Sequence, residues 1–187
     1  VLSQIPVYAR PAGTGLNFGP NTDSQRAVFA RFSREAAERY RGRIQAWEVW
    51  NEPNLTGYWA PAPNASDYVR LLAATTAAIR SADPGAVVVT GGTGGKGRTT
   101  DVEARAWIQQ VYDNGGRAHF DAVGLHAFTS PLNNNIGEIM LLAQYRAVLD
   151  RNGDYTKELW MTETGTTTRG TMSTSEQQSA NWLVETL

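Results

Sequence analysis

The chain has 187 residues, 41% of them hydrophobic, and its 17 Lys and Arg side chains balance 18 Asp and Glu. This length suits one globular domain with a sizeable core, so we expect residues 1–187 to form a single unit. Without a substantial net charge or a basic run, a nucleic-acid partner or an anionic membrane surface is disfavoured. The sequence contains no Cys, which excludes disulfides and thiol chemistry. No apolar run approaches the roughly 20 residues of a membrane span.

Apolar patterning and turn residues predict strands and helices in strict alternation. The strands are expected at residues 5–10, 44–50, 86–90, 120–128 and 158–163. The helices are expected to begin at Thr22 or Asp23, at Ser66, at Asp101, near Ile136 and near Ser173 to Ser175. This order predicts an α/β fold with a parallel sheet. Because the long loops follow the strands, a (β/α) barrel with its active face at the strand ends is favoured over a doubly wound open sheet.

Residues 47–54 are unusual for a core strand. They read Trp-Glu-Val-Trp-Asn-Glu-Pro-Asn and place Glu52 where a strand runs into a loop. Pro53 removes a ladder donor and biases Glu52 toward extended geometry. A carboxylate at a strand end is where barrel enzymes tend to place catalytic groups. Glu52 is therefore the first candidate for catalysis.

Glu163 repeats this placement at the end of the strand predicted at 158–163. Two carboxylates on one rim are what glycoside hydrolysis requires, because one protonates the leaving oxygen while the other attacks the anomeric carbon or activates water. A separation of about 5 to 5.5 Å gives retention through a covalent intermediate. Either Glu alone would be read as a solvated loop carboxylate, but Glu52 and Glu163 together favour the catalytic interpretation.

Three segments then resemble a known family. Residues 47–54 with Asn-Glu-Pro, residues 124–128 (Gly-Leu-His-Ala-Phe) and residues 160–165 (Trp-Met-Thr-Glu-Thr-Gly) closely resemble the retaining glycoside hydrolases of clan A, most of all the family 39-like β-xylosidases and endoglycosidases. The resemblance implies that Glu52 is the acid/base and Glu163 the nucleophile. It covers nearly the whole chain as strands 3 to 7 of a TIM barrel, implies no cofactor, and favours a secreted or periplasmic location.

Five residues are candidates for binding the sugar. The resemblance suggests that Asn51 bonds the sugar 2-hydroxyl and that His126 bonds or positions the nucleophile, although a turn Asn and a structural His are the plain alternatives. Trp50 and Trp59 could stack on sugar faces; Trp59, on a loop, is the better platform, whereas Trp50 could equally pack in the barrel. Asn17, in the loop after the first predicted strand, is the fifth candidate.

Three further features bear on the site. Period two puts Glu48 on the same face as Glu52, where a charge needs a partner, and Arg10 is our candidate. The family often has Tyr two residues after the His, where this chain has Phe128, so a hydroxyl contact to the nucleophile is lost or supplied elsewhere. The glycines of residues 91–96 match neither phosphate-binding motif, so we interpret them as allowing close backbone turns.

A complete barrel has eight strands and typically about 250 residues. The sequence therefore predicts a segment of a larger chain, without strands 1, 2 and 8, that is inactive or aggregation-prone alone. The expected substrate is a β-linked oligosaccharide or polysaccharide. A catalytically inactive barrel that binds carbohydrate or a protein partner is the alternative. A metal-dependent enzyme is disfavoured, because the two His residues, His119 and His126, lack metal-ligand spacing.

Overall fold

The structure is a computed structural model that describes residues 1–128, 136–166 and 173–186, without the side chains of residues 136–140 and 185–186. Its described strands are β1 (Ala46–Val49), β2 (Val87–Thr90), β3 (Ala122–Ala127) and β4 (Glu158–Thr164). They form one parallel sheet in the order β1-β2-β3-β4. Neighbours in sequence are thus neighbours in the sheet, as in a barrel, whereas a doubly wound sheet reverses its order at a switch point. The barrel-segment prediction is confirmed.

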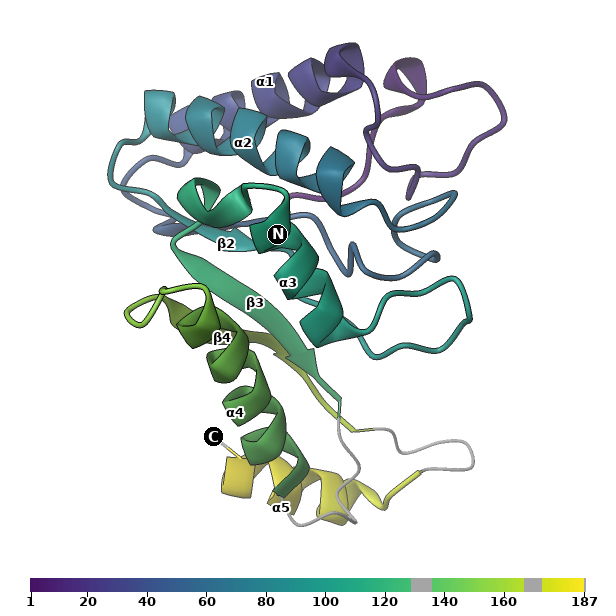
Figure 1. Cartoon of the computed structure of the whole chain (residues 1–187), viewed down its shortest axis with the longest axis vertical. Helices are drawn as coiled ribbons and strands as arrows, with labels where there is room; N and C mark the ends of the chain where they lie inside the picture. The colour runs from purple at the N-terminus through teal and green to yellow at the C-terminus, as the bar shows by residue number, and fades with distance from the viewer. Residues whose placement is uncertain (129–135, 167–172, 187) are drawn as a thin grey trace.

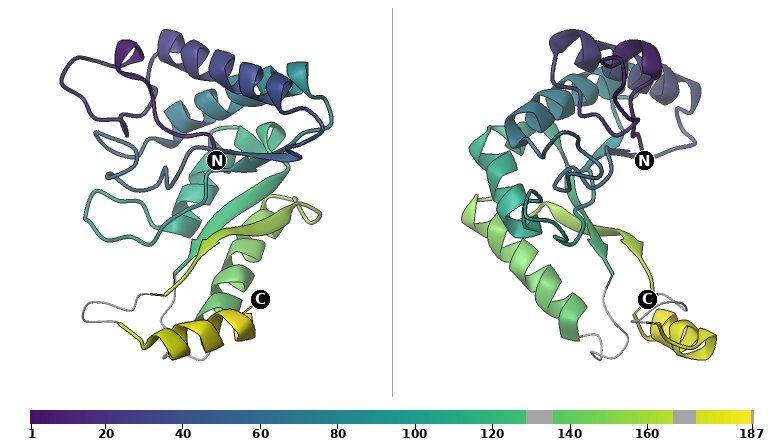
Figure 2. Two further views of the ribbon diagram at one scale, coloured as in Figure 1. Left: turned by 180° about the vertical axis from the view of Figure 1, so that it is seen from behind. Right: turned by 90° about the vertical axis from the view of Figure 1, so that its right-hand side faces the viewer.

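Helices α2 (Ala65–Ala82), α3 (Ala104–Asp113) and α4 (Ile136–Arg151) connect the strands and cover one face of the sheet. The described chain also forms α1 (Asp23–Arg39) before β1, α5 (Glu176–Thr186) after β4, and the short 3-10 turns η1 (Val7–Ala9) and η2 (Gly116–His119). Figure 1 shows α2, α3 and α4 side by side along the sheet, and the turned views of Figure 2 place them on its same side. The opposite face therefore corresponds to the inside of the barrel.

The helix starts follow local capping chemistry. Thr22 and Gln25 form the capping box of α1, as the sequence predicts for Thr22. The predicted cap at Ser66 is wrong, because the Asn64 side chain accepts from the Asp67 backbone and starts α2 earlier. The third helix also begins later than predicted, at a cap formed by Glu103. The Asp101 carboxylate instead accepts from the backbone N–H groups of Thr56, Gly97 and Arg98, so it does not cap α3.

The predicted strand at residues 5–10 is wrong. Residues Val7–Ala9 form the 3-10 turn η1, and the sheet-like pairing lies earlier, where the Leu2 N–H donates to the Glu48 carbonyl at 2.7 Å. Pro6 at the start of the turn has no N–H to give to a ladder. Val7 and Tyr8 are 73% and 72% exposed, so this part of the run does not belong to the core, whereas Ile5 is buried.

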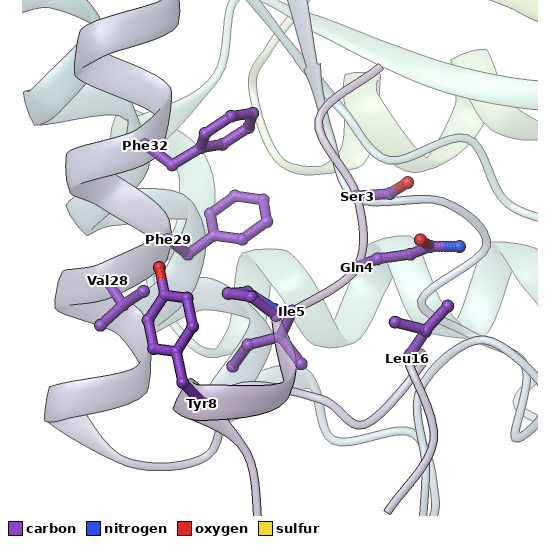
Figure 3. A pocket seen from close by; sticks show the side chains of 9 residues that line it. Ser3, Gln4, Ile5, Tyr8, Leu16, Val28, Phe29 and Phe32 are labelled. Carbon is purple, nitrogen blue, oxygen red and sulfur yellow. The ribbon is translucent and has the colours of Figure 1, made fainter.

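An apolar hollow of about 310 Å³ lies between this N-terminal segment and α1. Figure 3 shows Tyr8 beside Val28 and Phe29 of α1, with Ile5 close by. Ile5 and Phe29 are buried at its base, whereas Phe32 on the next turn of α1 is half exposed. The N-terminal segment therefore packs against α1 through side chains and not through a strand ladder.

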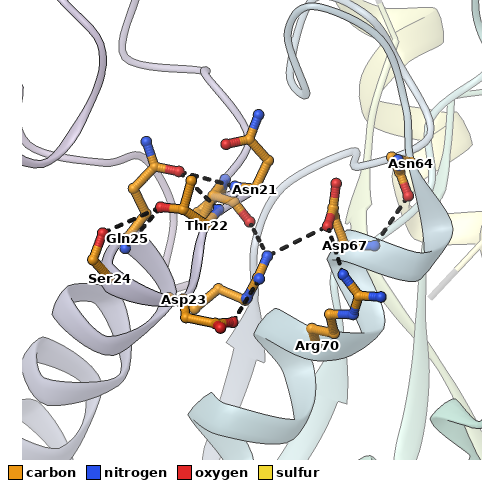
Figure 4. Close-up of polar contacts among 10 residues, drawn as sticks. Asn21, Thr22, Asp23, Ser24, Gln25, Asn64, Asp67 and Arg70 are labelled. Carbon is orange, nitrogen blue, oxygen red and sulfur yellow. Dashed lines mark hydrogen bonds and ion pairs between the residues drawn. The ribbon is translucent and has the colours of Figure 1, made fainter.

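Arg26 joins the start of α1 to the start of α2. Two of its partners, Asp23 and Asp67, are labelled in Figure 4. Its buried guanidinium donates to the Pro20 carbonyl at 3.1 Å and contacts Asp23 at 2.8 Å and Asp67 at 3.4 Å. The Asp67 carboxylate also contacts Arg70 at 3.6 Å. Hydrogen bonds between charged groups are stronger than neutral ones, so this cluster fixes the point at which the loop leaving β1 returns to the helical layer.

A row of aromatic rings fills the core beneath the end of β1. Phe29 of α1, Trp50, Trp59, Tyr68 of α2 and Trp107 of α3 follow one another with ring centroids 5.3 to 5.8 Å apart. Each of these rings is at most 2% exposed. Aromatic pairs in tilted or edge geometry contribute about 0.5–1.5 kcal/mol beyond their buried area. The row therefore anchors the loop after β1 to three helices at once.

Asp154 organises the turn between α4 and β4. Its carboxylate accepts from Arg117 at 2.9 Å and from the Tyr112 hydroxyl at 2.8 Å, and it pairs with Lys157 at 3.0 Å. Burial alone would raise the pKa of Asp154, but the hydrogen bonds from Lys157, Tyr112 and Arg117 outweigh it and hold the pKa below its usual range. A pKa lowered by folding means that the ionised form stabilises the fold.

Replacing Asp154 with Asn should lower the free energy of unfolding by about 2 kcal/mol at neutral pH, because three donors lose a charged acceptor. The stabilisation is present above the usual Asp pKa of about 3.9 and is lost as the pH falls below it. Urea unfolding at pH near 7 and near 3 should therefore show a deficit that shrinks in acid. Glu38→Gln removes the exposed pair with Arg34 and serves as the control, with an expected effect under about 0.5 kcal/mol. A deficit of equal size at both pH values would contradict this assignment.

Candidate active site

The chain turns sharply where β1 meets the loop. Trp50 and Glu52 have positive φ values of 74° and 43°, so the prediction of extended geometry for Glu52 is wrong. Backbone hydrogen bonds hold the turn: the Trp50 N–H donates to the Leu2 carbonyl at 2.6 Å, and the Glu52 N–H donates to the Gly92 carbonyl at 3.0 Å. Side chains at such φ values are strained by about 1–3 kcal/mol, and such residues cluster at active sites. This turn, held by its backbone hydrogen bonds, places the Glu52 carboxylate at the rim.

Tyr68 supports this turn from below. Its hydroxyl donates to the Val49 carbonyl at 3.1 Å and accepts from the Gly91 N–H at 2.8 Å, which joins the ends of β1 and β2. Burial raises the pKa of Tyr68 above its usual range. The phenol is therefore a stable neutral donor, and the ends of the two strands that flank Glu52 stay in register.

Glycines after β2 make room for the polar groups of the rim. A Cβ on Gly94 would lie 2.4 Å from a carboxylate oxygen of Glu52, and one on Gly92 would lie 2.3 Å from the His126 ring. A Cβ on Gly91 would lie 2.8 Å from the Val49 carbonyl oxygen and 2.9 Å from that of Trp50. These close approaches agree with the interpretation that the glycine-rich loop allows close backbone packing.

His126 brings the two predicted catalytic carboxylates together. Its Nδ1 lies 3.1 Å from Oε1 of Glu52 and 3.7 Å from Oε2 of Glu163. The first distance is a hydrogen bond and the second is not, so the imidazole contacts the expected acid/base more closely than the expected nucleophile. The His126 side chain is fully buried, whereas that of Glu163 is 43% exposed. His126 therefore positions carboxylates and presents no surface to a ligand.

A third carboxylate, Glu48, lies on the other side of the His126 ring. Its Oε1 is 3.9 Å from Nε2 of His126 and accepts hydrogen bonds from the Gly92 N–H at 2.7 Å and the Thr162 hydroxyl at 2.9 Å. The prediction that Arg10 neutralises Glu48 is wrong. No described contact joins them, and two Arg10 guanidinium nitrogens are buried without a hydrogen-bond partner. Arg10 misses Glu48 because its segment forms the η1 turn and no strand.

The predicted sugar-binding residues separate into two groups. Asn51 and Asn17 line a small cavity of about 110 Å³ with Ser3 and Tyr58. The Asn17 amide donates to the Gly57 carbonyl at 2.9 Å. Asn51 is half-buried, and its side chain has no hydrogen-bond partner among the described residues. Asn51 therefore offers a free amide at this cavity.

Trp50 and Trp59 are core residues. This corrects the prediction of Trp59 as the stacking platform, and for Trp50 it agrees with the predicted alternative of packing in the core. Trp50 is 1% exposed and Trp59 2%. The Trp50 ring N–H donates to the Tyr58 carbonyl at 2.7 Å. Gly19 packs so tightly on the Trp59 ring that a Cβ there would lie 2.2 Å away. Trp59 is on a loop, as predicted, but that loop folds back under the N-terminal segment and buries it.

Phe128 lies beside the site at the position where relatives often carry Tyr. Its ring meets the His126 ring at an edge, with centroids 6.2 Å apart, and it is 58% exposed. It offers an apolar surface next to the exposed Glu163. Phe128 itself supplies no hydroxyl to the nucleophile.

The comparisons with known proteins identify the fold family. The family model of the cellulases, glycosyl hydrolase family 5, matches residues 13–187. The chain belongs to this glycosyl hydrolase family. Among curated proteins, the β-xylosidase of Geobacillus stearothermophilus is 36% identical over 102 residues, which is 50% of this chain and 18% of that enzyme. The resemblance to clan A glycoside hydrolases is thereby confirmed.

Solved structures show the same barrel architecture. A family 39 glycoside hydrolase from Bacteroides cellulosilyticus WH2 has a TM-score of 0.67 at 23% identity and covers 93% of this chain and 36% of its own. A family 39 β-xylosidase from Caulobacter crescentus has a TM-score of 0.55 at 22% identity, with 87% and 35% coverage. The chain thus spans about a third of the length of these structures.

Other kinds of site were also sought in the described part of the chain. No described helix is long and apolar enough to cross a bilayer. Within the same residues, no group of three or more His, Cys, Asp or Glu side chains is arranged to hold a metal ion.

Sequence reasoning interpreted the glycines of residues 91–96 as allowing close turns, but it did not connect Gly92 and Gly94 with the carboxylates, and it missed Thr162. A Cβ on Gly94 would meet Glu52, the Gly92 N–H donates to Glu48, and so does the Thr162 hydroxyl. A signal existed for the glycines, because a run of them directly after a buried strand indicates close backbone approach. For Thr162 no comparable signal exists, since its contact with Glu48 depends on the register between β3 and β4.

Gly94→Ala should separate stability from activity. The added methyl would meet the mobile end of Glu52, which can move, so the melting temperature should change little while the carboxylate is displaced. A displacement near 1 Å costs about 100-fold in rate, which hydrolysis of aryl glycosides by the full-length protein would measure. Gly95→Ala is the matched control, because nothing lies within 4 Å of its Cβ position. Equal rates for the two variants would show that the absence of a side chain at Gly94 is not needed to make room for Glu52.

Proposed function

We propose that this chain carries the catalytic centre of a retaining O-glycoside hydrolase that cleaves β-linked sugars, with Glu52 as acid/base and Glu163 as nucleophile. The observation that supports this most directly is the position of both carboxylates on one atom of His126, at 3.1 Å and 3.7 Å from Nδ1. Membership in a glycosyl hydrolase family gives the reaction class. The roles of the two residues are our assignment.

The positions of the carboxylates are compatible with retention. Both oxygens are measured from one nitrogen, so these two oxygens are at most about 6.8 Å apart. This limit admits the carboxyl separation of about 5–5.5 Å that retaining enzymes use. The choice of retention over inversion follows from the resemblance to the retaining enzymes of clan A.

The reaction proceeds in two displacements. In the first, a Glu163 oxygen bonds to the anomeric carbon, the glycosidic C–O bond breaks, and the proton of Glu52 goes to the leaving oxygen. In the second, Glu52 takes a proton from water, the water oxygen bonds to the anomeric carbon, and the ester to Glu163 breaks. His126, buried between them, restricts both carboxylates to this geometry.

The different solvent exposure of the two carboxylates fits these roles. Glu52 is 9% exposed and is held by His126, as suits a group whose carboxyl must stay in one position when it meets the leaving oxygen. Glu163 is exposed, as suits a group that must reach the sugar carbon. Asn51, with its free amide, is the candidate for a hydrogen bond to the sugar 2-hydroxyl, an interaction that strengthens in the transition state.

The substrate class proposed is a β-linked oligosaccharide or polysaccharide, with β-xylosides tested first because the Geobacillus relative is a β-xylosidase. The described sheet has four strands and the chain spans about a third of its structural neighbours. We therefore propose that it is one unit of a larger barrel whose other strands complete the sugar pocket. Activity should be assayed in the full-length protein.

Glu163→Ala should lower kcat on a dinitrophenyl β-xyloside by roughly four orders of magnitude, because the covalent step is lost. Azide can then attack from the face that Glu163 leaves empty, so turnover should recover and yield the glycosyl azide of inverted configuration. Product configuration by NMR decides the assignment. An azide of retained configuration would identify Glu52 as the nucleophile instead.

Two controls complete this test. Glu38→Ala, on the exposed side of α1, should leave kcat unchanged. Wild-type hydrolysis should survive a chelator, because the proposed chemistry uses only carboxylates and water. A folded wild-type protein that hydrolyses no aryl glycoside, yet binds carbohydrate or a protein partner, would favour the inactive-barrel alternative.

A further inference from the structure

β4 is interrupted immediately before the proposed nucleophile. Leu125 of β3 faces Met161, and His126 faces Glu163, so Thr162 has no partner across the ladder. One strand thus contributes an extra residue, which defines a β-bulge. Bulges re-aim side chains and are frequent next to active sites.

The bulge changes where two consecutive side chains point. In a regular strand, neighbours alternate between opposite faces, so Thr162 and Glu163 could not both face the barrel interior. Here the Thr162 hydroxyl donates to Glu48 at 2.9 Å, while the Glu163 carboxylate lies 3.7 Å from His126. Both Glu48 and His126 belong to the same buried cluster. Glu163 therefore reaches the site only because Thr162 takes up the extra position.

Glu48 is built into the sheet as a fixed acceptor for Thr162. The Gly92 N–H donates to the same Glu48 oxygen at 2.7 Å. A Cβ on either Gly92 or Gly124 would lie 2.9 Å from that oxygen, so only glycine fits at these two positions without a shift of Glu48. Glu48 is 7% exposed, and a buried carboxylate is costly unless it accepts hydrogen bonds. This acceptor thus links β1, the loop after β2, β3 and β4 at one atom.

We propose that Glu48 and Thr162 are positioning residues for the nucleophile: their hydrogen bond holds the bulge that aims Glu163 at the anomeric carbon. The inference rests on the proposed function for the identity of the nucleophile. The two catalytic carboxylates are then not sufficient by themselves, because the direction of Glu163 also depends on this hydrogen bond. Neither Glu48 nor Thr162 needs to touch the sugar.

Thr162→Val tests this in the full-length protein, because it keeps the side-chain shape and removes the hydroxyl. We expect kcat to fall about 100-fold on both a dinitrophenyl and a phenyl β-xyloside, with KM little changed, because the nucleophile is misplaced for every leaving group. Thr162→Ser keeps the hydroxyl and should recover most of the rate. Glu52→Gln is the contrast, since loss of the acid should harm the poor phenyl leaving group far more than the good one.

Crystal structures of the wild type and of Thr162→Val provide a readout that does not need activity. We expect the variant to lose the bulge or to move Glu163 away from His126, at a melting temperature near that of wild type. An unchanged bulge and Glu163 position in Thr162→Val, or equal rate losses in the Val and Ser variants, would overturn the inference. A wild type inactive on glycosides would overturn the proposed function, and the crystallographic comparison would still decide this inference.

Discussion

The buried imidazole of His126 is the constraint on which the rim depends. It has one carboxylate on its Nε2 side and two on its Nδ1 side, and these come from β1, the loop after β1 and the end of β4. Burying this many ionisable groups is costly unless each one finds partners within a few ångströms. The strand ends must therefore meet in one register. The glycines at 92, 94 and 124 follow from the same requirement, because any side chain there would occupy the space of a carboxylate or of the imidazole.

The aromatic core explains how the strained turn at Glu52 persists. Positive φ values at Trp50 and Glu52 are unfavourable by themselves. The Trp50 ring is held between Phe29 and Trp59, and its N–H is bonded to the Tyr58 carbonyl, so the backbone cannot relax without opening the core. The two Trp rings thus act on the site from below, by packing, and not by contact with a sugar.

Much of this site is predictable from sequence because each of its main residues lies at or just after the end of its own strand. His126 and Glu163 lie at the ends of β3 and β4, and Glu52 follows β1 by three residues. Strand ends of a parallel barrel meet at one rim, so their proximity follows from the order of elements. The burial of Trp59 could not be predicted in this way, because it depends on a contact with Gly19, forty residues earlier in the chain. The first strand was misplaced because the apolar run around Val7 resembles a strand, although the pairing residue is Leu2. The bulge at Thr162 depends on register, which no single strand encodes.

The two carboxylates are restrained in different ways, and this difference follows from where they lie in the sheet. Glu52 is enclosed, with His126 on one side and the Gly94 backbone on the other. Glu163 follows the register shift between β3 and β4, so the regular alternation of the strand does not set its direction. Its aim must then be set by a contact across the barrel interior, and the hydrogen bond from the adjacent Thr162 to Glu48 is the contact that the structure provides.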